Sequence, residues 1–196
     1  MEPIILASSS PRRQEILRML HIPFQVIMPN IDETITTALE VEDIPELLAR
    51  EKVSAVIHTL PAGQEIPWVL GADTVIVYGG KIYGKLENQE EAASFLKDFS
   101  GKTHNVISAL VLYNGRQHTT TAKVCKTRVK FKELTDEEIQ WYVDTGEWHG
   151  AAGGYRIQSL ASIFIEKIEG SDSGVIGFPI FELYDILKEQ GYSLLE

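Results

Sequence analysis

The sequence contains a single cysteine, Cys125, among its 196 residues, so no disulfide can form within the chain. Disulfides belong to oxidising compartments, and a chain with one thiol and without a secretory signal is expected to be cytoplasmic. Cys125 lies in the run AKVCKTRV, which reads as a strand. No neighbouring feature would lower the pKa of a thiol there, so we expect an inert packing or surface residue.

Long apolar runs are also missing from the sequence, and none approaches the ~18 residues that a membrane span needs. Positive charge is scarce, because 18 Lys and Arg stand against 28 Asp and Glu, a formal net charge of −10. Nucleic acids and anionic membrane surfaces bind proteins that present a basic face. The composition therefore argues against both as partners, and it makes any local cluster of Arg and Lys more informative.

The hydrophobic fraction of 44% is that of an ordinary globular protein. Short apolar runs predict strands at residues 4–7, 24–28, 68–77, 106–113 and 163–165. Capping residues and prolines predict helices that begin near Pro11, Asp43 with Glu46, Asn88 with Glu91, Thr135 with Glu138, and Pro179. This mixture, with a hairpin turn at Asn114-Gly115, predicts a mixed β-sheet flanked by helices in an α/β or α+β arrangement. We find no clear linker and expect one domain over residues 1–196.

The stretch LASSSPRR, residues 6–13, joins an apolar strand to the start of a helix. A helix N-terminus has unpaired N–H groups and the positive end of the helix dipole, so Arg12 and Arg13 add like charge to like. Ser8 and Ser10 add hydroxyl donors. The arrangement favours a bound anion, and phosphate is the usual one. The alternative is that the serines only cap the helix and the arginines pair with nearby carboxylates.

The stretch GADT, residues 71–74, places Asp73 within an apolar, β-branched strand. A carboxylate in that setting needs a metal, a cation or an activated water as its partner. Gly71 permits another group to approach the strand closely. The alternative is that Asp73 stands at the end of the strand and faces solvent.

Four further residues are weaker candidates when taken singly. Lys52 on the second helix and Lys85 after Gly84 could contribute to an anion site, although a lone lysine is usually a solvated surface residue. Asp32 and Glu33 follow the second strand, on the same edge as the SSSPRR junction, and could hold a divalent cation; acidic loops without a metal are just as common. The five histidines show no zinc spacing.

The stretch GGYRIQS, residues 153–159, combines glycines that permit a tight backbone with a ring and an amide. Gln158 offers one donor and one acceptor group, which can read the edge of a nucleobase. An ordinary turn that leads into a strand is the alternative.

Seven motifs follow one another along the chain: LASSSPRR, AREK at 49–52, GADT, GK at 84–85, TDEEIQWYV, GYRIQ and GVIGFP at 174–179. In these motifs and their order, the sequence resembles the Maf-like nucleoside triphosphate pyrophosphatases over almost the whole chain. The resemblance implies two lobes with a deep cleft, in a fold similar to the inosine triphosphatases. It also implies hydrolysis of a nucleoside triphosphate to the monophosphate and pyrophosphate, with a divalent metal, Mg²⁺ or Mn²⁺.

The resemblance also implies roles for single residues. Asp73 would be the catalytic acidic residue and, with Glu33, a metal ligand. The substrate-selecting positions would be Arg12, Thr74 and Gln158. The remaining phosphate contacts would be Ser8, Ser10, Arg13, Lys52 and Lys85. The tripeptides PRR and ADT and the dipeptide IQ are similar to the subgroup that acts on dTTP and UTP, whereas the subgroup that acts on 7-methyl-GTP reads PW, SDQ and a glutamate.

The chain departs from the family in the glycine loop. The family often reads DKAGAYGIQ, and at residues 150–158 this sequence reads GAAGGYRIQ, so the acid and the lysine are gone and Arg156 replaces a glycine. We expect a house-cleaning hydrolase for dTTP and UTP, with modified pyrimidine nucleotides open as substrates. The altered loop motivates the alternative, a catalytically weak nucleotide-binding regulator of cell division. A nucleoside triphosphate is the expected partner, and a homodimer is left open.

Overall fold

The computed structural model describes residues 1–33, 40–61 and 68–194. The chain divides into two compact units. Unit 1 comprises Met1–Asp73, Ser108–Cys125 and Gly177–Glu196, and unit 2 comprises Thr74–Ile107 and Lys126–Ile176. Each unit has a hydrophobic core of its own. The expectation of one functional domain stays a prediction.

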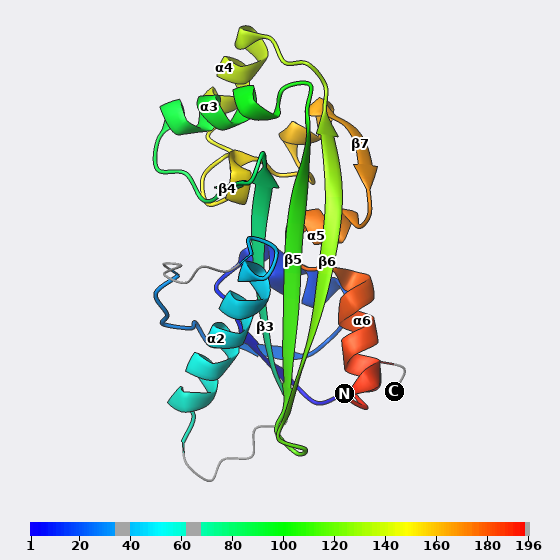
Figure 1. Ribbon diagram of the computed structural model, residues 1–196. Helices are drawn as coiled ribbons and strands as arrows, with labels where there is room; N and C mark the ends of the chain where they lie inside the picture. The colour runs from blue at the N-terminus through cyan, green and yellow to red at the C-terminus, as the bar shows by residue number, and fades with distance from the viewer. Residues whose placement is uncertain (34–39, 62–67, 195–196) are drawn as a thin grey trace. The chain divides into compact units, whose positions relative to one another are not determined.

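Seven strands form one mixed sheet within the described residues, in the order β2-β1-β3-β5-β6-β7, with β4 paired to β3 (Figure 1). The strands are β1 (Ile4–Ala7), β2 (Phe24–Val26), β3 (Trp68–Tyr78), β4 (Lys81–Tyr83), β5 (Thr103–Asn114), β6 (Thr119–Phe131) and β7 (Ile165–Glu169). β1 pairs in parallel with both β2 and β3, whereas β3–β4 and β6–β7 are antiparallel. Helices flank this sheet, so the predicted mixed α/β architecture is confirmed.

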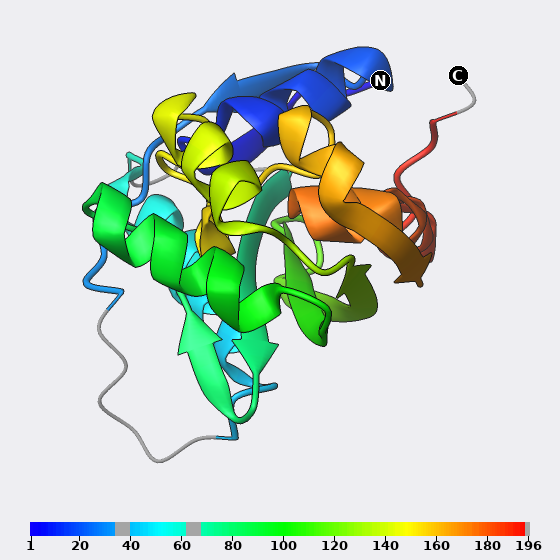
Figure 2. The same ribbon diagram turned by 90° about the horizontal axis from the view of Figure 1, so that it is seen from above.

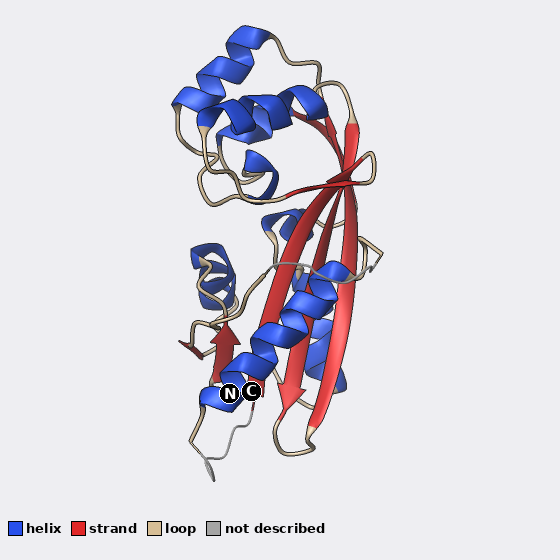
Figure 3. Ribbon diagram, turned by 60° about the vertical axis from the view of Figure 1, so that its left-hand side comes forward, coloured by secondary structure: helices blue, strands red, loops and turns tan. Residues whose placement is uncertain are grey.

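The described part of unit 1 contains three helices: α1 (Pro11–Met19), α2 (Ile44–Thr59) and α6 (Ile180–Glu189). Helix α1 connects the parallel strands β1 and β2. Helix α2 lies across the strands of unit 1 in Figure 3. Its residues Ala49, Val53 and Val56 form a buried cluster with residues of β1, β3 and β5. This packing fixes the face of α2 that is turned toward the strands.

Unit 2 packs α3 (Gln89–Phe99) beside α4 (Asp136–Asp144), as Figure 2 shows. It also contains the short helix α5 (Asp172–Ile176) and the 3₁₀ helices η1 (Ala152–Gly154) and η2 (Leu160–Phe164). The predicted caps of α3 and α4 are confirmed: the side chain of Asn88 accepts from the Glu91 amide, and Thr135 with Glu138 forms a complete capping box.

Two local predictions are wrong. The side chain of Asp43 makes no capping hydrogen bond with any described residue, and Glu46 pairs with Arg50 one turn later. The apolar run at residues 163–165 is not a strand throughout, because η2 ends at Phe164 and β7 begins at Ile165. Three apolar residues fit either structure, and only packing decides between them. No helix within the described ranges is long and apolar enough to cross a membrane.

His104 is a buried polar residue among the aromatic side chains of unit 2. Its ring stacks on Phe99 with 4.2 Å between centroids, and its Nε2 lies 2.7 Å from the hydroxyl of Tyr155. Its Nδ1 is buried without a hydrogen-bond partner among the described residues. Burial lowers the pKa of His104 to about 3, so the folded protein keeps this imidazole neutral.

We expect His104 to make the protein sensitive to acid. Its ordinary pKa is 6.5, so between that pH and about 3 the unfolded chain binds a proton that the folded chain does not. The free energy of unfolding should therefore fall as pH falls through this window, by about 1.4 kcal/mol per pH unit from this group. Urea unfolding measured between pH 7 and about pH 4.5 tests this slope.

His104→Phe retains an aromatic ring beside Phe99 and should flatten the dependence of unfolding on pH. His58→Gln, at an exposed histidine of α2, is the control for removing an imidazole. An equally steep slope in His104→Phe and in the unmodified protein would show that other groups cause the acid sensitivity.

Candidate active site

The junction between β1 and α1 lies beside the middle of β3. The two strands are parallel neighbours with Ala7 opposite Gly71, so the residues that follow Ala7 lie beside those that follow Gly71. Carboxyl ends of parallel strands are the usual place for a ligand site in α/β proteins. The topology therefore brings LASSSPRR and GADT together.

Ser8 and Ser10 have different roles at this junction. Ser10 is the N-cap of α1, but its side chain makes no capping bond with the described residues. Instead, the buried hydroxyl of Ser8 accepts from the amide of Ser10 at 3.2 Å. The first turn of α1 lacks an acidic residue, so no carboxylate of its own offsets the positive end of the helix dipole.

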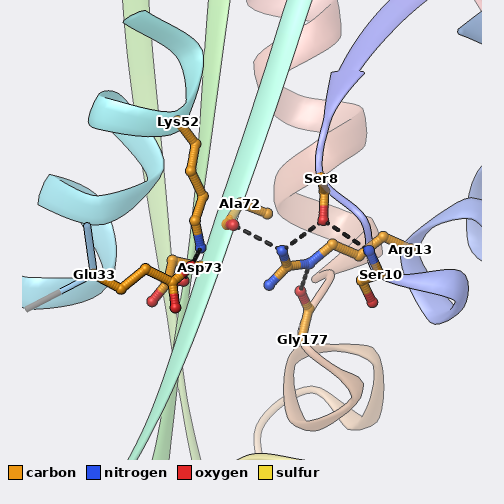
Figure 4. A network of polar contacts seen from close by, with 8 residues as sticks. All are labelled: Ser8, Ser10, Arg13, Glu33, Lys52, Ala72, Asp73 and Gly177. Atoms are coloured by element: carbon orange, nitrogen blue, oxygen red, sulfur yellow. Dashed lines mark hydrogen bonds and ion pairs between the residues drawn. The ribbon is translucent and has the colours of Figure 1, made fainter. Parts of the chain in front are cut away.

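Arg13 fixes this junction to two other segments of unit 1 (Figure 4). Its Nη1 donates to Ser8 Oγ at 3.0 Å and to the carbonyl of Ala72 at 2.8 Å. Its Nε donates to the carbonyl of Gly177 at 3.0 Å. These bonds use three of the five N–H groups of the guanidinium. Arg13 therefore positions backbone, and a contact with phosphate stays a prediction.

The charges around Arg13 are close enough to act on it. Burial lowers the pKa of Arg13, and the positive charge of Arg12 adds to this effect, whereas the carboxylates of Asp73 and Glu33 oppose it. Guanidinium groups stay protonated in proteins despite such shifts. Arg13 therefore lies within electrostatic range of a second guanidinium and of two carboxylates.

Gly71 explains how Asp73 comes to face α2. Side chains alternate along a strand, so Gly71 and Asp73 point to the same face of β3. A Cβ atom on Gly71 would lie 2.6 Å from Val53 Cγ2 and 2.7 Å from the carbonyl oxygen of Ala49. Only glycine allows α2 to approach β3 this closely, as the sequence predicted. Lys52 follows Ala49 by three residues and so lies on the same face of the helix.

Lys52 links two carboxylates, as Figure 4 shows. Its Nζ lies 2.5 Å from Asp73 Oδ1 and 2.7 Å from Glu33 Oε1. Lys52 and Asp73 are only 7% and 8% exposed, which rules out the alternative of a solvent-facing Asp73. Because an apolar pair of similar size would usually be at least as stable as a buried ion pair, stability alone does not explain these residues.

The remaining predicted residues belong to unit 2. Thr74 directly follows Asp73 at the boundary between the units, and Lys85 and Gln158 are exposed. The glycine loop and the Lys85 segment are joined, because the amide of Gly153 donates to the carbonyl of Gly84 at 2.9 Å. Gly153 has a positive φ, and a Cβ atom there would lie 2.5 Å from Ile76 Cδ1, so the loop requires glycine.

The structure thus brings together, within unit 1, Ser8, Ser10, Arg12, Arg13, Glu33, Lys52 and Asp73. Sequence reasoning missed the carbonyls of Ala72 and Gly177, which anchor Arg13. Backbone acceptors carry no residue-type signal, so no pattern could have identified them. The segment GVIGFP begins within α5, because residues 174–176 are helical.

The comparison with protein families agrees with these observations. Residues 3–190 match the sequence model of the family described as Maf-like protein. The chain therefore belongs to the Maf-like family, as the motifs predicted.

Curated relatives align with the whole chain or almost all of it. A protein of Desulforamulus reducens named dTTP/UTP pyrophosphatase is 42% identical over 100% of both chains. A relative with the same name in Pelotomaculum thermopropionicum is 40% identical over 100% of both chains. Another in Hahella chejuensis is 42% identical over 97% of this chain and 94% of its own. A solved structure of the Staphylococcus aureus Ham1 protein matches at a TM-score of 0.45 and 14% identity, covering 66% of this chain and 72% of that one, a likeness too low to support an argument.

Proposed function

We propose that the protein hydrolyses nucleoside triphosphates to the monophosphate and pyrophosphate, with dTTP and UTP as preferred substrates. Membership of the Maf-like family and the shared name of the relatives support this reaction. The observation that carries the proposal is the buried ion pair between Asp73 and Lys52. Asp73 directly follows Ala72, whose carbonyl accepts a hydrogen bond from Arg13. A triphosphate requires cations to bind it and a carboxylate to direct water, and unit 1 contains both cations and a carboxylate where β1 ends beside the middle of β3.

In the proposed reaction, a water molecule attacks the α-phosphorus of the substrate. The bond from this phosphorus to the oxygen that bridges to the β-phosphorus breaks, and pyrophosphate leaves with that oxygen. Lys52 occupies Oδ1 of Asp73, so Oδ2 is the atom that we assign to the attacking water. The water's proton passes to this carboxylate and then to solvent.

The other residues bind and orient the triphosphate in this proposal. Phosphoryl transfer depends mainly on positioning and on neutralising charge. Arg12, Lys52 and Lys85 would neutralise the phosphates, and the hydroxyl of Ser10 with the first amides of α1 would orient them. Arg13 would hold the junction in place through its carbonyl bonds. Thr74 and Gln158 would contact the pyrimidine.

Asp73 and Glu33 suit the divalent cation that the family implies. Carboxylate oxygens with water and substrate phosphates are the ligands that Mg²⁺ usually takes. When bound, such an ion offsets negative charge that develops on the phosphates. Within the described ranges no group of three or more Asp, Glu, His and Cys converges, so substrate and water would have to complete the coordination. Lys52 neutralises the same two carboxylates, and we expect it to compete with the cation for them.

A substrate panel tests the proposed function. The purified protein, with Mg²⁺ or Mn²⁺, should release pyrophosphate from UTP and dTTP at least about tenfold faster than from CTP or ATP. Chelation of the metal should stop the release. Release of orthophosphate in place of pyrophosphate would contradict the reaction. Binding of UTP without any turnover would instead support the alternative, a nucleotide-binding regulator. The altered glycine loop is the reason for considering this alternative.

A homodimer, a cytoplasmic location and modified pyrimidine substrates stay predictions.

Arg156, which replaces a glycine of the family pattern, donates through Nη2 to the carbonyl of His149 at 2.7 Å. This bond gives Arg156 a part in holding its own loop.

A further inference from the structure

The segment that carries Gln158 is held at its start by the aromatic core of unit 2. Tyr155, three residues before Gln158, is buried, and its hydroxyl is hydrogen-bonded to His104 at 2.7 Å. The bond from Arg156 to the carbonyl of His149 adds a second restraint. The side chain of Gln158 is itself exposed, so a well-held backbone presents an accessible amide.

Glu147 holds the same segment at its end. Its Oε2 accepts from the Ser159 hydroxyl at 2.6 Å and from the Leu160 amide at 3.2 Å. Its Oε1 accepts from the Ala161 amide at 3.4 Å. These amides open η2, and the first amides of a helix lack acceptors within the helix. The N-cap residue Ser159 supplies no side-chain cap in the described structure, so Glu147 takes that role from another part of the chain.

Glu147 is itself held in place by two further hydrogen bonds. The buried hydroxyl of Tyr142 in α4 donates to its Oε1 at 3.2 Å, and its own amide donates to Thr145 Oγ1 at 3.2 Å. The carboxylate therefore transmits the position of α4 to the residues that directly follow Gln158. Hydrogen bonds to a charged acceptor are stronger than neutral ones, which suits this function.

We propose that Glu147 is a positioning residue that sets the orientation of Gln158 and, through it, the choice of base. This inference rests on the proposed function, in which Gln158 contacts the pyrimidine. An amide distinguishes bases by the directions of its donor and acceptor, so a small displacement of its backbone weakens the discrimination. Uracil presents a carbonyl acceptor at the position where cytosine presents an amino donor, so UTP against CTP is the sensitive comparison.

The test compares Glu147→Gln with a matched control in the same unit. Glutamine keeps the size of the side chain but replaces one accepting oxygen by an NH₂ group, which cannot accept, so either Ser159 and Leu160 or Ala161 lose their acceptor. Glu166→Gln removes an exposed carboxylate of β7 that pairs with Lys130 at 2.8 Å. The ratio of kcat/KM for UTP to that for CTP should fall about tenfold in Glu147→Gln and stay unchanged in Glu166→Gln.

A double variant separates positioning from a general effect on the fold. Glu147→Gln combined with Gln158→Ala should show the same UTP/CTP ratio as Gln158→Ala alone, because both changes act through one amide. If Glu147→Gln lowered only the melting temperature and left the ratio unchanged, the inference would be overturned. A ratio in the double variant equal to the product of the two single effects would overturn it too.

Hydrogen exchange gives a readout that does not need turnover. Protection of the Leu160 and Ala161 amides should fall in Glu147→Gln and persist in Glu166→Gln. Unchanged protection in Glu147→Gln would show that Glu147 does not hold the segment. If the unmodified protein released no pyrophosphate from any triphosphate, the proposed function and the selection of base would both fail, and the exchange result would still decide whether Glu147 fixes residues 159–161.

Discussion

Replacement of Asp73 by asparagine should lower kcat for UTP by about a hundredfold or more, because the site would lose the group that we propose directs water and helps to hold the cation. Asparagine has nearly the same shape, so the effect tests charge and basicity and not packing. Lys52 keeps Glu33 as a partner at 2.7 Å, which should preserve the fold. Steady-state release of pyrophosphate measures kcat, and circular dichroism checks that the variant is folded.

Asp185→Asn is the matched control for this substitution. Asp185 is a half-exposed carboxylate of α6 in the same unit, and it pairs with Lys123 at 2.8 Å. Loss of that surface ion pair should leave kcat unchanged, since exposed pairs contribute little to stability. A folded Asp73→Asn protein that kept kcat within about threefold of the unmodified protein would remove Asp73 from the mechanism.

Replacement of Gly71 by alanine should lower the stability of the protein, because the added methyl group has no space between β3 and α2. The new Cβ atom would lie 2.7 Å from the carbonyl oxygen of Ala49 and 2.6 Å from Val53 Cγ2. A backbone carbonyl in a helix cannot rotate away, so α2 has to move from β3. Such overpacking costs about 1–3 kcal/mol, and the melting temperature should fall by several degrees. The displaced helix should also draw Lys52 away from Asp73 and lower kcat.

Gly84→Ala controls for the loss of a glycine. Its backbone does not need a positive φ, and no described atom lies within 4 Å of where its Cβ would be, so the melting temperature should not fall. Differential scanning calorimetry of the two variants makes the comparison. Equal melting temperatures for Gly71→Ala and the unmodified protein would mean that α2 does not press on β3 at this residue.

Local patterns predicted much of the fold, because the determinants are close together in sequence. Pro11, Asn88 and Thr135 with Glu138 stand where α1, α3 and α4 begin, and the strand predicted at residues 68–77 lies within β3 (Trp68–Tyr78). Patterns failed where two structures compete for the same residues. Asp43 and Glu46 have the spacing of a capping box, but Arg50 takes Glu46 as its i+4 partner.

By itself, the sequence determined the order of the motifs, the acidic residue within an apolar strand and the cations at a helix start, since each depends on neighbours along the chain. Tertiary structure alone decided which groups meet. Lys52 and Asp73 stand 21 residues apart, and their pairing depends on how closely α2 approaches β3 at Gly71. The sequence showed that Arg13 is a positively charged residue at a helix start. Its acceptors, the carbonyls of Ala72 and Gly177, are 59 and 164 residues away along the chain, and only tertiary packing brings them into contact with it.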